Sequence, residues 1–156
     1  MIKYTDTQVV FREFPNEVTL AINLSLCPNN CDGCHSPYLR EDTGAVLDTI
    51  TLDMLIRKNN GITCVGFMGG DNDTETLLNL VRHVKNSTGL KCGWYSGKDN
   101  VDGKILDSKM CDYIKVGHYD KIAGPLDKET TNQRFLRLKN GKYENMTHLF
   151  WKNKNI

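Results

Sequence analysis

The sequence lacks any apolar run near the roughly 20 residues that a membrane-spanning helix requires. Its first ten residues, MIKYTDTQVV, also lack the apolar region of a signal peptide. We therefore expect a cytoplasmic protein with no membrane partner. Six cysteines in a cytosolic chain point to metal or redox chemistry before they point to disulfide bonds.

The sequence also lacks an excess of charge of either sign. Its 20 basic and 19 acidic residues give a formal net charge of +1. Proteins that bind nucleic acid carry a basic footprint, so we expect no nucleic-acid partner here. The length of 156 residues and the 39% hydrophobic content are ordinary for one soluble domain, and we expect a single domain over 1–156.

Three cysteines, Cys27, Cys31 and Cys34, lie within eight residues, but no fourth cysteine follows nearby. A structural zinc site has four ligands, and a ferredoxin-type cluster run has four cysteines. A [4Fe-4S] cluster held by three thiolates instead keeps one iron open to a small molecule. The C-x3-C-x2-C spacing therefore favours a chemically active iron–sulfur centre. The alternative is a zinc site completed by His35 or by a distant residue.

Segments with strand character alternate with amphipathic helical segments along the middle of the chain. This alternation predicts an α/β fold with a mostly parallel sheet. Strands are predicted at 17–26, 62–68, 90–96 and 111–116, and helices at 36–40, 51–59, 74–85 and 101–109. We also expect an accessory strand or hairpin arm at 7–14 and a terminal hairpin formed by 133–138 and 142–147.

Gly69, Gly70 and Asp71 come directly after the predicted strand 62–68. Two glycines let the main chain approach a ligand closely, and a carboxylate can receive an ammonium group. Loops at the carboxyl ends of parallel strands are the usual place for function. The alternative is an ordinary glycine turn before a helix that Asp71 or Asp73 caps.

Three further cysteines, Cys64, Cys92 and Cys111, lie in apolar strand segments. A free cysteine in such a segment behaves as a small buried hydrophobe. The sequence therefore does not indicate a second cluster.

The cysteine spacing after a strand resembles that of the radical S-adenosylmethionine (SAM) superfamily. The stretch CPNNCDGCHSP is similar to the activating proteins of anaerobic ribonucleoside-triphosphate reductase. Gly69-Gly70-Asp71 resembles the GGE-type motif of the superfamily, which binds the amino group of SAM. The series DYIKVG, GPL and TNQR, between residues 112 and 134, resembles the carboxyl-terminal segment of the same activating proteins.

This resemblance implies a fold, two cofactors and a set of site residues. The implied fold is a partial β/α barrel, since 156 residues cannot supply the roughly 250 of a complete barrel. The implied cofactors are a [4Fe-4S] cluster held by Cys27, Cys31 and Cys34, and SAM bound at 69–71.

The resemblance also implies a reaction. The reduced cluster would split SAM, and the resulting 5′-deoxyadenosyl radical would remove hydrogen from a glycine of the large reductase subunit. A flavodoxin or ferredoxin would supply electrons. The alternatives are the activase of another glycyl-radical enzyme, a radical SAM enzyme for a small substrate, an iron–sulfur electron carrier and a zinc-binding module.

Overall fold

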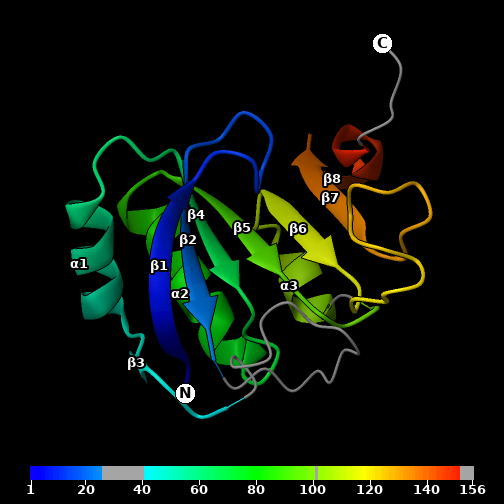
Figure 1. The fold of residues 1–156 in the computed structure, drawn as a ribbon. Coiled ribbons are helices and arrows are strands. Elements are labelled where there is room, and N and C mark those ends of the chain that lie inside the picture. The colour runs from blue at the N-terminus through cyan, green and yellow to red at the C-terminus, as the bar shows by residue number, and fades with distance from the viewer. Residues whose placement is uncertain (26–40, 101, 152–156) are drawn as a thin grey trace.

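The computed structural model describes residues 1–25, 41–100 and 102–151. Within them one eight-stranded sheet has the order β3-β1-β2-β4-β5-β6-β7-β8 (Figure 1). The strands are β1 (Lys3–Val10), β2 (Thr19–Leu24), β3 (Ala45–Val46), β4 (Cys64–Met68), β5 (Lys91–Tyr95), β6 (Tyr113–Val116), β7 (Arg134–Lys139) and β8 (Lys142–Asn145). The helices are α1 (Thr49–Lys58), α2 (Thr74–Ser87), α3 (Gly103–Ser108) and the short 3-10 helix η2 (Thr147–Phe150).

The sheet is mixed, so the prediction of a mostly parallel partial β/α barrel was wrong. Only β2–β4, β4–β5 and β5–β6 pair in parallel. The other four of the seven pairings, β1–β2, β1–β3, β6–β7 and β7–β8, are antiparallel. The alternation of strands and helices in the sequence predicts only the parallel pairings, in which a helix connects two neighbouring strands. The segments before and after them add antiparallel strands on both sides, and such strands need no intervening helix.

The principal helices begin where acidic N-cap residues precede an apolar pattern. Asp48 accepts a hydrogen bond from the Thr51 backbone N–H at 2.8 Å before α1. Asp73 does the same for α2, accepting from Thr76 at 3.1 Å. The helices predicted at 51–59, 74–85 and 101–109 and the terminal hairpin are confirmed, whereas the helix predicted at 36–40 lies outside the described residues. No helix within the described ranges is long and apolar enough to cross a membrane.

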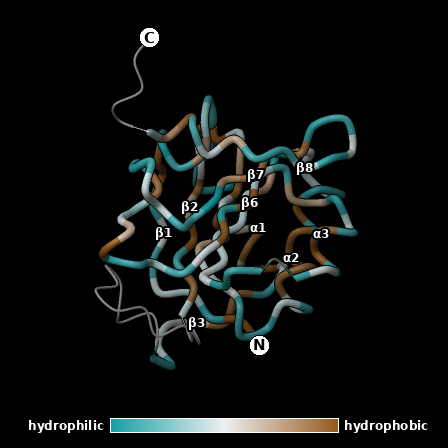
Figure 2. Tube along the Cα trace, turned by 90° about the vertical axis from the view of Figure 1, so that its right-hand side faces the viewer, coloured by the Kyte–Doolittle hydropathy of each residue, from teal (hydrophilic) through white to brown (hydrophobic). Residues whose placement is uncertain are grey.

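Helices α2 and α3 lie behind the sheet in Figure 1, and the hydrophobic stretches in Figure 2 concentrate where they meet it. Alternate strand residues on that side form the main core with α2. They include Leu20, Ile22, Val65, Phe67, Trp94 and Ile114, packed with Leu77, Leu80, Val81 and Val84. We call the opposite side, which carries Ala21, Met68, Tyr95 and Lys115, the open face.

A second, smaller core covers the part of the open face that lies over the amino-terminal halves of the parallel strands β4, β5 and β6. We call this part the amino-terminal half of the open face. Phe14, from the segment between β1 and β2, stacks on Tyr113 with ring centroids 5.3 Å apart. A Cβ atom on Gly93 would lie 2.3 Å from the Phe14 ring, and one on Gly66 would lie 3.1 Å from it. These two glycines therefore create the space into which Phe14 packs, and this packing fixes the segment 11–16 over the sheet.

We predict that Gly93→Ala destabilises the protein by about 1–3 kcal/mol, because overpacking a filled core forces side chains and backbone to shift. Denaturant unfolding monitored by circular dichroism measures the effect. The control is Gly103→Ala at the exposed start of α3, where no atom lies within 4 Å of the added Cβ. Equal unfolding midpoints for the two variants would show that Phe14 does not need the space above Gly93.

Candidate functional site

The carboxyl ends of four strands meet at one edge of the sheet. The parallel pairings place Asn23 beside Met68, Met68 beside Tyr95, and Tyr95 beside Lys115. These four residues thus form one row across β2, β4, β5 and β6. The loops that follow these strands leave the sheet next to this row.

The predicted cluster ligands Cys27, Cys31 and Cys34 lie outside the described residues. Strand β2 ends at Leu24, three residues before Cys27. A Cβ atom on Gly69 would lie 3.3 Å from the Leu24 Cβ and 3.4 Å from the Leu24 carbonyl oxygen. The end of β2 therefore lies directly beside the glycine pair. Within 1–25, 41–100 and 102–151, no three His, Cys, Asp or Glu side chains are grouped to hold a metal ion.

Gly69 and Gly70 form the turn that follows β4. Their φ angles are +121° and +97°, a region that side-chain-bearing residues rarely adopt. The Gly69 N–H donates to the Tyr95 carbonyl at 3.1 Å. A Cβ atom on Gly70 would meet Leu24 and Leu77, each at 3.3 Å. Backbone conformation and packing alone account for both glycines, and their contact with SAM stays a prediction.

Asp71 links the loop after β4 to the loop after β5. Its side chain is buried, and its two carboxylate oxygens accept hydrogen bonds from the Ser96 hydroxyl at 2.7 Å and the Gly97 N–H at 2.9 Å. Ser96 in turn accepts from the Lys98 N–H at 3.2 Å. These contacts fix the orientation of the Asp71 carboxylate between the two loops.

The TNQR segment, Thr131 to Arg134, lies at the same edge, because β7 runs antiparallel to β6 and begins beside the carboxyl end of β6. The Gly117 N–H donates to the Lys98 carbonyl at 2.8 Å, and the Gln133 side-chain amide donates to the Gly117 carbonyl at 3.3 Å. Arg134 donates to the Asp99 carbonyl at 2.9 Å. These residues therefore hold the loops after β5 and β6 together.

An exposed His–Asp pair belongs to the same network. His118 Nδ1 and Asp99 Oδ1 lie 2.7 Å apart, and this hydrogen bond lowers the pKa of Asp99. The Asn132 amide donates to the His118 carbonyl at 3.0 Å. The polar residues of TNQR thus act on backbone carbonyls, which gives the motif a structural explanation.

A cavity of about 580 Å³ opens on the carboxyl-terminal half of the open face. We call it the open-face pocket. Its floor is the row Asn23, Met68, Tyr95 and Lys115. The segment between β1 and β2, the loop after β6 and the helix η2 supply its walls through Arg12, Glu13, Tyr119, Pro125, Leu126, Asp127, Gln133 and Phe150.

Lys115 places a buried cation in the floor of this pocket. Its side chain is 3% exposed, and its ammonium donates to the Tyr95 hydroxyl at 2.8 Å and to Glu13 at 3.2 Å. The rings of Tyr95, Phe150 and Phe14 lie 4.5, 4.5 and 5.2 Å from Nζ. Burial lowers the pKa of Lys115 to about 8, although Glu13 acts in the opposite direction.

Sequence reasoning did not assign a role to Lys115 and did not single out Arg12 or Glu13. The available signal was a lysine inside the apolar segment Tyr113–Val116, because a lysine is almost never fully buried unless it is paired. Nothing local in the sequence connects Lys115 with Glu13, which lies 102 residues away along the chain.

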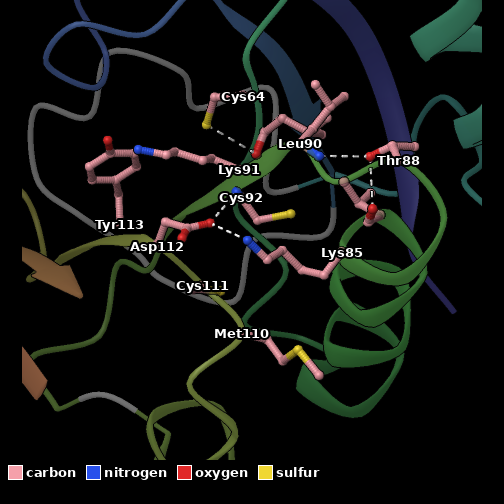
Figure 3. Close-up of polar contacts among 12 residues, drawn as sticks. Cys64, Lys85, Thr88, Leu90, Lys91, Cys92, Met110, Cys111, Asp112 and Tyr113 are labelled. Carbon is pink, nitrogen blue, oxygen red and sulfur yellow. Dashed lines mark hydrogen bonds and ion pairs between the residues drawn. The ribbon is translucent and has the colours of Figure 1, made fainter. Parts of the chain in front are cut away.

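The cysteines Cys64, Cys92 and Cys111 are free and buried, as predicted. Burial raises the pKa of Cys64 and of Cys111 to about 12, so these thiols stay protonated and unreactive near neutral pH. Figure 3 shows that Asp112, near two of them, accepts from the Lys85 ammonium at 2.8 Å and from the Cys92 N–H at 2.9 Å. The aspartate of the DYIKVG stretch therefore links α2 to the start of β5.

Comparison of the sequence with models of known protein families identifies the family of this chain. The sequence model of the family described as 4Fe-4S single cluster domain matches residues 18–146. The chain belongs to the 4Fe-4S single cluster domain family. The match spans all three predicted ligands, and soft thiolates are the ligands that iron–sulfur clusters prefer, so this 4Fe-4S domain is an iron–sulfur protein. Comparisons with curated proteins and with solved structures gave no match.

We predict that Lys115→Met changes how the free energy of unfolding depends on pH. A lysine whose pKa falls from 10.5 to about 8 on folding costs stability below pH 8, and this cost disappears as pH rises toward 10.5. Between pH 7 and 9 the wild type should therefore gain about 1.4 kcal/mol relative to Lys115→Met.

Denaturant unfolding of both proteins at each pH measures this difference. Burial raises the pKa of Tyr95, which contacts Lys115, so this tyrosine stays protonated over the range, and the buried cysteines contribute alike in both proteins. A constant difference between the two proteins across this range would contradict the lowered pKa of Lys115.

Proposed function

We propose that this 4Fe-4S domain is a radical SAM enzyme that generates a glycyl radical on the large subunit of anaerobic ribonucleoside-triphosphate reductase. One observation carries most weight. The strand leading to the three-cysteine motif ends beside Gly69, at the edge where the open-face pocket lies. A strand that leads to the predicted ligands, a glycine turn and a substrate-sized cavity at one edge support this reaction.

Separate residues would bind the two cofactors. Cys27, Cys31 and Cys34 would hold a [4Fe-4S] cluster, and three thiolates leave one iron without a protein ligand. The backbone at Gly69 and Gly70 and the carboxylate of Asp71 would bind the methionine part of SAM. When bound, the reduced cluster supplies the electron that splits SAM into methionine and a 5′-deoxyadenosyl radical.

The chain's own contribution is binding, orientation and exclusion of water. Asp71 is held by Ser96 and Gly97, so it would meet the SAM amino group without reorganisation. Apolar side chains such as Met68, Leu126 and Phe150 line the pocket and would exclude water from a reactive radical. We infer that the peptide carrying the target glycine enters this pocket, and that a flavodoxin or ferredoxin in the cytoplasm supplies the electron.

The rival functions differ in what they need. An electron carrier passes electrons at its surface and a zinc-binding module only stabilises structure, so neither uses a cavity of about 580 Å³. Activases of other glycyl-radical enzymes and small-substrate radical SAM enzymes share the cofactors. The TNQR segment, which resembles that of the reductase activating proteins, favours the reductase as partner.

We predict a glycyl radical signal when the anaerobically reconstituted and reduced protein is mixed with SAM and the large reductase subunit. Electron paramagnetic resonance detects the signal. Cys31→Ala is the control, since losing one of three thiolates should abolish cluster absorbance and SAM cleavage together. A protein that shows cluster absorbance but neither binds nor cleaves SAM would be a carrier, and a protein without this absorbance would favour a zinc site.

We also predict that Gly70→Val weakens SAM binding about tenfold or more while cluster absorbance remains, because the added side chain displaces the turn beside Leu24 and Leu77. Equilibrium binding of SAM to the reconstituted protein measures the effect. Gly61→Val is the matched control, since Gly61 also has a positive φ, +88°, but no atom within 4 Å of an added Cβ. Equal SAM affinity in the two variants would remove Gly70 from the binding site.

A further inference from the structure

The ammonium of Lys115 has more donors than its protein partners use. A lysine carries three N–H donors. Among the described residues, the Tyr95 hydroxyl and the Glu13 carboxylate accept two of them. The surrounding rings attract the charge but offer no oxygen or nitrogen acceptor. One donor of a side chain that lines the open-face pocket is therefore left for a ligand.

The charges around the pocket define what kind of ligand suits this donor. Arg12 and Lys115 contribute two positive charges to the lining, and Glu13 and Asp127 contribute two negative ones. Because Glu13 already pairs with Lys115, an anionic ligand would bring a second carboxylate to one buried ammonium. An uncharged acceptor avoids this repulsion and still satisfies the donor. The amide carbonyl of a peptide is such an acceptor.

We propose that Lys115 binds and positions the substrate by donating a hydrogen bond to a main-chain carbonyl oxygen of the peptide that carries the target glycine. This inference rests on the proposed function, in which a segment of the large reductase subunit enters the open-face pocket. A glycine has no side chain to recognise, so the enzyme has to read the backbone around it. A rigidly held donor in the pocket floor does this, because Tyr95, Glu13 and three rings fix its position.

A purely structural role for Lys115 predicts a different behaviour. Lys115 also anchors Glu13, and through it the segment between β1 and β2 that forms one pocket wall. If anchoring were its only role, Glu13→Met, which removes the acceptor, would mimic Lys115→Met. If Lys115 contacts the peptide, Glu13→Met keeps the donor and should retain most of the affinity for the partner.

The test measures the dissociation constant for the purified large subunit by isothermal titration calorimetry. The reconstituted protein is used with SAM but without a reductant, so that no turnover occurs. Lys115→Met should weaken binding about tenfold to a hundredfold, the effect of leaving one buried acceptor unsatisfied. Lys115→Met should fold, since it removes a buried charge, and circular dichroism verifies this. The exposed Lys104→Met, on α3, controls for loss of a positive charge and should bind like wild type.

The outcomes separate this inference from the proposed function. Wild-type protein that neither binds the large subunit nor forms a radical on it would refute the proposed function itself. Wild-type binding together with unchanged binding by Lys115→Met would overturn only the role of Lys115. Equal weakening by Glu13→Met and Lys115→Met would also overturn it, in favour of anchoring alone. Weakening confined to Lys115→Met would support it.

Discussion

Three parallel strand pairings hold the ends of β2, β4, β5 and β6 at one edge, and the whole candidate site depends on their register. The register aligns Met68, Tyr95 and Lys115 across the open face. A slip of one residue in β6 would turn Lys115 toward the helices, where its ammonium would enter the main apolar core. Burial of that core, with Ile114 and Val116 on the helix side, therefore also fixes the lysine in the pocket floor.

The open face is divided between stability and binding. Its amino-terminal half is filled by Phe14, Tyr113 and Phe135, and Phe14 packs on the surface that Gly66 and Gly93 leave free. Its carboxyl-terminal half keeps a cavity of about 580 Å³. Lys115 lies between the two halves, with its ammonium over the rings of Phe14, Tyr95 and Phe150. The aromatic packing that stabilises the amino-terminal half of the open face therefore also forms one side of the open-face pocket.

Local sequence patterns predicted those parts of the fold that local chemistry determines. Apolar periodicity gave α1, α2 and the buried strands, and the apolar surroundings of Cys64 and Cys92 correctly indicated burial. The class of the sheet could not be predicted in this way. The strand predicted at 7–14 is β1, which spans Lys3–Val10. Which strand pairs with β1 depends on contacts between distant segments, and its sequence is the same whether its neighbour is parallel or antiparallel.

In the candidate site, too, the sequence predicted local motifs but not the contacts between distant segments. Short motifs marked Gly69, Gly70 and Asp71, but the hydrogen bonds from Ser96 and Gly97 to Asp71 exist only because β4 and β5 are neighbours. The pair Glu13 and Lys115 joins two elements far apart in the chain, so no local spacing reports it.

The direction of the strands also separates two sets of thiols. Cys64 begins β4, and Cys92 and Cys111 lie near the starts of β5 and β6, whereas Cys27 follows the end of β2. The first three are buried and stay protonated, so incoming iron and sulfide find no competing ligand among them during cluster assembly. Because oxidation of a thiol requires exposure and thiolate character, we expect oxidants to spare these three buried sulfurs.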